Sequence, residues 1–143
     1  MRMQEINDVL EHIKKFENIS DGTYDILTSK SVEYQEGYQV SFVRPEAFEF
    51  LSKQGWDIIT NHLCKLLNSI AHIGVYGGNP EVSFHCLDKR KALQTMEKYN
   101  QESIFDWERN YKYPNSEQDW FILNQLFDKE KVLDYDKIIE EIL

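Results

Sequence analysis

The chain has 143 residues, of which 41% are hydrophobic and 13% aromatic, and it carries a formal net charge of −9. A chain of this length buries about 68–70% of its extended surface on folding, so one core stabilises it without a metal or a disulfide. Its aromatic content excludes a disordered chain. Its negative charge disfavours direct nucleic-acid binding, although a surface that mimics DNA is an alternative. No apolar run approaches the ~20 residues that span a bilayer, so we expect no membrane contact.

The two cysteines, Cys64 and Cys86, both fall on apolar positions of their segments. The N-terminus lacks the basic and apolar pattern of a signal peptide. We therefore expect reduced, buried thiols and a cytoplasmic location. A disulfide is the alternative interpretation of the cysteine pair.

The first elements are predicted from the spacing of apolar residues and from turn formers. Residues 3–16 place apolar side chains three and four positions apart, which predicts an amphipathic helix. Strands are expected at 23–28 and 38–43, with a short edge strand at 31–34, because turn-forming residues bound these runs. Pro45 ends the strand expected at 38–43, since proline has no amide hydrogen to donate to a sheet.

The centre of the chain predicts a long helix followed by a β-hairpin. Ser52 is a suitable N-cap for the helix. Its expected buried stripe is Trp56, Ile59, Leu63, Leu66, Leu67 and Ile70. Residues 71–76 and 81–86 then flank a four-residue break, residues 77–80, which predicts a hairpin with a long connection rather than a two-residue turn.

Strict alternation in this hairpin predicts one apolar face and one polar face. The expected apolar side chains are Ile73, Val75, Val82, Phe84 and Cys86, and the expected polar side chains are His72, Tyr76, Glu81, Ser83 and His85. In the earlier strand, Tyr38, Val40 and Phe42 should point inward, and Gln39 and Ser41 should join the polar face.

A third predicted helix begins after Asp88, a natural N-cap, and runs through Tyr99. Its first residues, Lys89-Arg90-Lys91, are basic at the end where the helix dipole disfavours cations. One interpretation is that these three side chains are simply solvated, and the other is that a function of the protein requires them at this position.

Helices are also predicted for the rest of the chain. Ser103 and Asp106 have the spacing of a variant capping box for a helix at 104–111, and further helices are expected at 120–127 and after Asp134. The fold class is therefore α+β: one domain, residues 1–143, with a mostly antiparallel sheet of four to five strands and helices packed on one face. Within it, residues 1–100 form the sheet-containing core and residues 101–143 an acidic, aromatic helical segment.

The polar sheet face is a candidate site for a small anionic or nucleotide-like ligand, because hydroxyl, imidazole and amide groups supply donors and acceptors. Its candidate ligand-binding residues are Gln39, Ser41, Arg44, Tyr76, Ser83 and His85. A solvated face of an antiparallel sheet is the competing interpretation. A hydrolase that uses this face is a further alternative, although no nucleophile motif surrounds Ser83.

The sequence predicts no catalytic residues, metal site or cofactor. His85 and Cys86 are neighbours in a strand and point to opposite faces, so they do not converge on one ion. Gly74, Gly77 and Gly78 lead into a strand rather than a helix N-terminus, so they are not a phosphate-binding fingerprint.

The last third of the chain is the candidate protein interface. Residues 101–143 carry 11 acids and 5 bases, a net charge of −6. The same segment is rich in tyrosine and tryptophan, which are favoured anchors of protein interfaces, and its acidity favours a basic partner. The candidate interface residues are Trp107, Tyr111, Tyr113 and Trp120.

Two strings of the sequence resemble those of small uncharacterised accessory proteins carried by phages and integrative elements of Gram-positive bacteria. They are Gly37-Tyr38-Gln39-Val40-Ser41-Phe42-Val43-Arg44-Pro45 and Ile73-Gly74-Val75-Tyr76-Gly77-Gly78 to Phe84-His85. The resemblance covers residues 20–110, carries no catalytic residues, and implies inhibition of a host defence system. We therefore expect a non-enzymatic binding protein that acts through a protein partner and forms a homo-oligomer, with small-ligand binding as the alternative.

Overall fold

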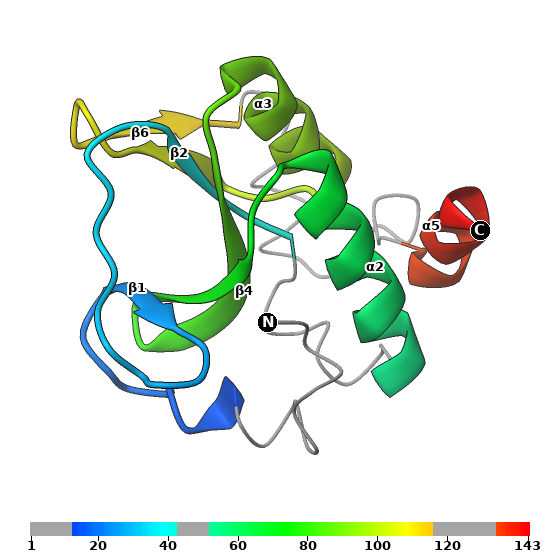
Figure 1. The fold of residues 1–143 in the computed structure, drawn as a ribbon, viewed down its shortest axis with the longest axis horizontal. Helices are drawn as coiled ribbons and strands as arrows, with labels where there is room; N and C mark the ends of the chain where they lie inside the picture. The colour runs from blue at the N-terminus through cyan, green and yellow to red at the C-terminus, as the bar shows by residue number, and fades with distance from the viewer. Residues whose placement is uncertain (1–12, 43–51, 116–133) are drawn as a thin grey trace, which may run out of the picture.

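One antiparallel sheet with helices on one of its faces makes up the described part of the chain, an α+β fold (Figure 1). The structure is a computed structural model that describes residues 13–42, 52–115 and 134–143. Six strands lie in the order β1-β3-β4-β2-β5-β6, rather than the expected four to five. The elements are β1 (Gly22–Asp25), β2 (Tyr38–Ser41), α2 (Lys53–Leu66), β3 (Ala71–Tyr76), β4 (Asn79–Cys86), α3 (Lys89–Lys98), β5 (Ser103–Asp106), β6 (Tyr111–Pro114) and α5 (Tyr135–Ile142).

The predicted hairpin forms the centre of the sheet, but its turn is shorter than expected. Tyr76 pairs with Asn79, which leaves only Gly77 and Gly78 between the strands. Both glycines have positive φ, 59° and 80°, as a type I′ turn requires. The expectation of a long connection was wrong, because Asn79 and Pro80 belong to β4 rather than to the turn.

A second hairpin replaces the helix expected at 104–111. Strand β5 pairs with both β2 and β6, and Asn110 takes a positive φ of 52° in the turn. The carboxylate of Asp106 caps this turn by accepting from the amide of Arg109 at 3.1 Å, so it does not start a helix. The expectation of a helical C-terminal third is therefore corrected over residues 103–114.

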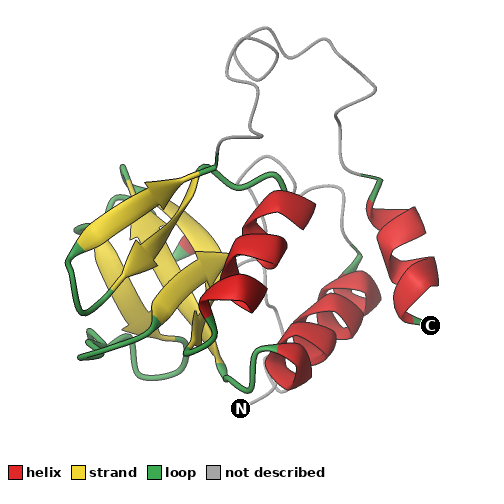
Figure 2. Cartoon of the chain, turned by 90° about the horizontal axis from the view of Figure 1, so that it is seen from above, coloured by secondary structure: helices red, strands yellow, loops and turns green. Residues whose placement is uncertain are grey.

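Helices α2 and α3 cover one face of the sheet, as the separated layers of Figure 2 show. Both begin at the predicted caps: the side chain of Ser52 accepts from the amide of Gly55, and that of Asp88 accepts from the amide of Lys91. These bonds satisfy amides that the first helical turn leaves without partners.

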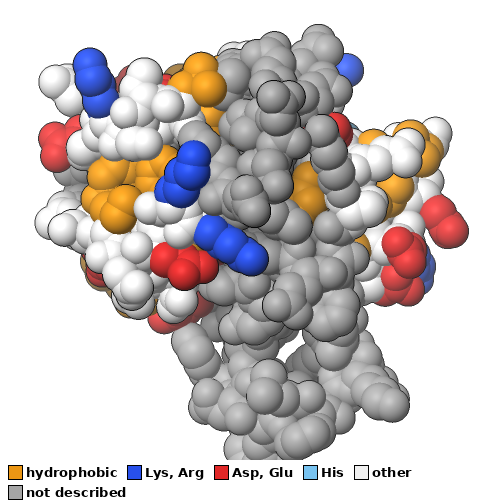
Figure 3. Space-filling view, turned by 90° about the horizontal axis from the view of Figure 1, so that it is seen from below, with side chains coloured by type: hydrophobic (Ala, Val, Ile, Leu, Met, Phe, Trp, Pro, Cys, Tyr) orange, Lys and Arg blue, Asp and Glu red, His pale blue; other side chains and the backbone are white. Residues whose placement is uncertain are grey.

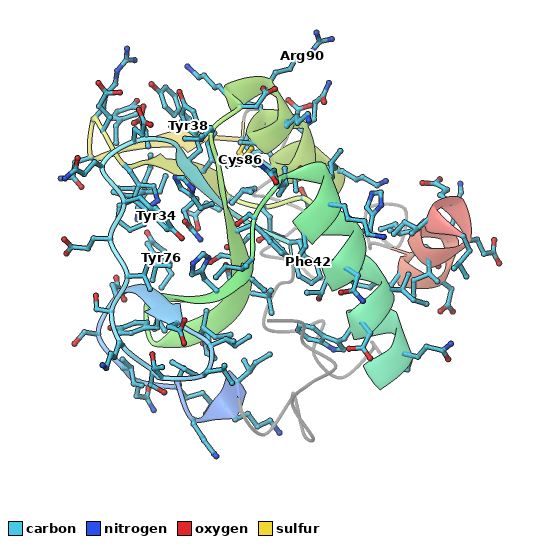
Figure 4. All side chains as sticks on the ribbon, in the orientation of Figure 1. Tyr34, Tyr38, Phe42, Tyr76, Cys86 and Arg90 are labelled. Carbon is cyan, nitrogen blue, oxygen red and sulfur yellow. The ribbon has the colours of Figure 1, made fainter. Side chains whose placement is uncertain are left out.

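Phe42 lies at the centre of the core between the sheet and the helices (Figure 4). Its ring centroid is 5.9 Å from that of Trp56 and 5.7 Å from those of Phe84 and Tyr99. The apolar face of the hairpin is buried against this cluster, as the alternation predicted. The predicted stripe of α2 is buried only in part, because Leu66 and Ile70 are exposed where the helix ends.

Two expected elements lie largely or wholly outside the described residues: most of the helix at 3–16 and the helix at 120–127. None of the described helices is long and apolar enough to cross a membrane. On the face shown in Figure 3, acidic and basic side chains lie among small groups of hydrophobic ones. Charge of both signs is therefore present on this face of a chain whose net charge is −9.

Candidate functional site

The polar face of the sheet is covered by the chain itself. We name residues 26–37, which connect β1 to β2, the strap; Figure 1 shows this connection on the side of the sheet opposite α2 and α3. The strap is joined to β1 by hydrogen bonds, from the amide of Asp25 to the carbonyl of Lys30 and from the amide of Val32 to the carbonyl of Thr23. The polar side of the sheet is therefore a second packed layer.

Tyr34 is the side chain by which the strap contacts the sheet. Its ring stacks on His85, with centroids 3.8 Å apart and planes 8° from parallel, and meets the rings of His72 and Trp107 edge-on. Its hydroxyl is hydrogen-bonded to Nε2 of His72 at 2.8 Å. Nε2 of His85 donates to the carbonyl of Glu36 at 2.7 Å, which fixes this ring on the strap as well.

A chain of hydrogen bonds continues across the face beneath Tyr34. The indole Nε1 of Trp107 donates to Oε1 of Gln39 at 3.2 Å, and Nε2 of Gln39 donates to Oγ of Ser83 at 3.0 Å. Gln39 and Ser83 are both buried. Since buried polar groups without partners are costly, these bonds explain how a polar face is tolerated inside the molecule.

His72 lies deepest in this cluster and is only 1% exposed. Its pKa falls from 6.5 to about 4, chiefly because of burial and less because of the nearby His85, against a smaller opposing effect of Asp25. The imidazole is therefore neutral at neutral pH and acts as the hydrogen-bond partner of Tyr34. Its Nδ1 atom has no hydrogen-bond partner in the described structure.

The structure brings most of the predicted ligand-binding residues onto one face. Gln39 pairs with His85 and Ser41 with Ser83 across β2 and β4, so these four side chains share that face. Tyr76 lies at its end and is 50% exposed.

The chain's own side chains occupy this face, so it offers neither the solvated surface nor the open ligand face that the sequence suggested. Arg44 lies outside the described residues. Sequence reasoning missed Tyr34, which fell in an expected edge strand; only Ser31 of that run forms a bridge, to Tyr24.

The geometry of this face does not assemble a hydrolytic pair. Ser83 is 1% exposed and its hydroxyl accepts from Gln39, while the ring of His85 is held by Glu36 and Tyr34. A serine nucleophile needs a base within hydrogen-bond reach and an accessible oxygen. Within residues 13–42, 52–115 and 134–143, no group of three histidine, cysteine or acidic side chains is placed to hold a metal ion.

The predicted interface residues separate into two environments. Trp107 is half-buried and bonded to Gln39 under the strap, so it is part of the packed polar face rather than an exposed anchor. Trp120 lies outside the described residues. Tyr111 and Tyr113 lie on β6 at the edge of the sheet, and Tyr111 is 53% exposed.

We name Tyr38, Tyr111, Tyr113, Lys89 and Arg109 the tyrosine patch. The rings of Tyr111 and Tyr113 meet edge-on with centroids 5.0 Å apart, and Tyr38 lies 6.4 Å from Tyr113. The ammonium of Lys89 lies 4.1 Å above the ring of Tyr113. The guanidinium of Arg109 donates to the hydroxyl of Tyr113 at 3.0 Å, so two cations fix this tyrosine.

Comparisons of the chain with protein-family models, with curated proteins and with solved structures find no match. Function is therefore inferred from the geometry of the described residues alone.

Proposed function

We propose that this protein is a non-enzymatic binding protein that contacts a protein partner through the tyrosine patch. The observation that supports this most directly is Tyr111, which is 53% exposed although its ring packs against Tyr113. Tyr113 is itself fixed, because its hydroxyl donates to the carboxylate of Asp106 at 3.3 Å and accepts from Arg109.

A surface fixed in this way favours binding for an energetic reason. Ordering a side chain at an interface costs about 0.5–1.5 kcal/mol, and side chains held before binding avoid part of that cost. Tyrosine and arginine are also the residue types that most often dominate interface energies. The patch combines both types in contacts that exist without a partner.

The charge of the patch indicates the chemistry of the partner. Lys89 and Arg109 place two cations around Tyr113, at the edge of a chain whose net charge is −9. An acidic surface complements these cations and is attracted to them over a Debye length of about 8 Å at physiological salt. The tyrosine patch therefore favours an acidic partner, whereas the acidity of residues 101–143 favoured a basic one.

Replacing Tyr111 by alanine tests the contact, and Tyr76→Ala is its matched control. The two tyrosines have nearly equal exposure, 53% and 50%. The two tyrosines lie on opposite faces of the sheet. Tyr111 shares its face with Tyr38 of the patch, because both pair with Asp106. The ring of Tyr76 lies under Lys112, which shares the strap-side face with Gln39 because both pair with Phe105.

In quantitative affinity capture from a bacterial host, Tyr111→Ala should lower recovery of the partner at least about tenfold, the effect of losing one interface anchor. Tyr76→Ala should recover it as wild type does, and higher salt should weaken wild-type capture. Components of host defence are the first partners to assay, following the resemblance to phage and mobile-element proteins. Equal losses with both variants, each shown to be folded by circular dichroism, would contradict the assignment to the tyrosine patch.

A further inference from the structure

A hollow of about 170 Å³ lies between α2 and α3, on the side of the sheet opposite the strap. We name it the helix groove. It is lined by His62, Leu63, Leu66, Lys91, Gln94, Thr95, Lys98 and Tyr99. Three of these eight residues are basic and none is acidic, in a chain with 25 acidic residues and 16 lysines and arginines.

Two nearby lysines act electrostatically on His62 of the helix groove. Burial lowers the pKa of His62, and the positive charges of Lys98 and Lys65 lower it further. Lys98 already holds an anion of the chain itself: its ammonium lies 3.7 Å from the carboxylate of Glu141 on α5, and both side chains are largely exposed. An exposed ion pair of this kind contributes little stability, so an external anion can replace the glutamate at small cost.

Tyr99 is a buried residue of the groove lining. It is 1% exposed, and its hydroxyl has no hydrogen-bond partner in the described structure. Burial raises its pKa to about 12, so the hydroxyl remains a neutral donor. A buried donor without an acceptor costs about 1–3 kcal/mol, and a ligand in the hollow does not recover this cost, because the hydroxyl oxygen itself is fully covered.

The remaining lining sets the size and polarity of what fits. Leu63 and Leu66 give the hollow an apolar wall. A cavity of about 150 Å³ is large enough to bind benzene, so 170 Å³ accommodates one ring-sized apolar body.

We propose that the helix groove binds a small organic anion: a single-ring apolar body against Leu63 and Leu66, with a phosphate or carboxylate that takes the place of Glu141 at Lys98. This site is independent of the tyrosine patch and of the protein partner proposed for it. It also differs from the polar sheet face, which the sequence suggested for an anionic ligand and which the strap fills.

Phenyl phosphate is the probe, followed by NMR of the backbone amides of the full chain. It should cause saturable shifts in α2 and α3, and benzoate in a parallel titration shows whether a carboxylate serves as well. Inorganic phosphate and phenol, which each supply half of the ligand, should bind at least about tenfold more weakly, because neither combines charge with apolar burial.

Three variants test the position of the anion. Lys98→Gln should weaken binding of phenyl phosphate at least about fivefold, because it removes the cation, and Glu141→Gln should strengthen it, because it removes the competing carboxylate. Lys89→Gln removes the same charge from α3 outside the groove and should change affinity less than about twofold. Tyr111→Ala should leave this binding unchanged, which separates the groove from the protein contact.

Two results would overturn the proposal. One is the absence of saturable shifts with both phenyl phosphate and benzoate at concentrations up to about 10 mM. A dissociation constant above that concentration would be too weak for a small-molecule site. The other is an equal effect of Lys98→Gln and Lys89→Gln, which would mean that the probe responds to the general charge of α3 rather than to a built site.

Discussion

Gly37 joins the strap to β2 in a backbone conformation that favours glycine, with φ at +87°. A Cβ atom placed there would lie 2.5 Å from Nε2 of His85 and 3.1 Å from the carbonyl oxygen of Cys86. That nitrogen is the one that donates to Glu36. The close approach of strap and sheet at His85 therefore depends on the absence of a side chain at residue 37.

Alanine substitutions at Gly37 and Gly77 separate this contact from backbone strain alone. Gly77 also has positive φ, at 59°, but nothing lies within 4 Å of a Cβ added to it. Gly77→Ala should lower the free energy of unfolding by about 1 kcal/mol, and Gly37→Ala by at least about 2 kcal/mol more, because the new methyl group displaces His85. Urea unfolding measures both. Equal losses would show that the ring of His85 moves aside freely.

At the scale of the element, helix α3 links the two proposed sites through its basic first turn. Lys89 extends over Tyr113 of the tyrosine patch, and the ammonium of Lys91 donates to the carbonyl of Leu66 at the end of α2. Three cations at a helix N-terminus oppose the helix dipole, so contacts outside the helix offset part of that cost. Asp88 offsets more of it as an acidic N-cap, accepting from the amide of Lys91 at 3.2 Å.

The cap of α3 can be tested by two substitutions of one residue. Asp88→Ala should lower the free energy of unfolding by about 1 kcal/mol, because the amide of Lys91 loses its acceptor and the negative charge disappears. Asp88→Asn keeps an acceptor oxygen and should cost less than half as much. Thermal and urea unfolding would show the difference. Matching losses would mean that the charge stabilises the helix start and the cap bond does not.

At the scale of the molecule, both faces of the sheet are packed, one against apolar helices and the other against the polar strap. The strap side of the sheet holds a buried titratable group, His72, whose neutral imidazole is hydrogen-bonded to the hydroxyl of Tyr34. Folding therefore excludes the proton that His72 takes up in the unfolded chain below pH 6.5.

Stability should accordingly depend on pH in a definite direction. The contribution of His72 is fully present above pH 6.5, and it is lost as the pH falls from 6.5 toward the folded pKa of about 4. The loss amounts to about 3 kcal/mol at most, and the lowered pKa of His62 acts in the same direction. His72→Gln should flatten this dependence in urea unfolding measured at several pH values. A variant that keeps the full slope of wild type would show that His72 is not its source.

The sequence by itself determined the features that depend on neighbouring residues. Alternation in β3 and β4 placed Phe84 in the core and His85 on the opposite face, because successive side chains of a strand point to opposite sides. Ser52 and Asp88 identified the starts of α2 and α3, because a cap acts on amides two or three positions away.

Tertiary structure decided the features whose partners are distant in the chain. The local cap signal of Ser103 and Asp106 predicted a helix, but pairing with β2 and β6 makes residues 103–106 a strand. The polar face is closed by Tyr34, whose contacts His72 and His85 lie 38 and 51 positions further along the chain. Periodicity reports which side chains share a face but not what covers it, because the cover comes from a segment whose path is set by the packing of the whole chain.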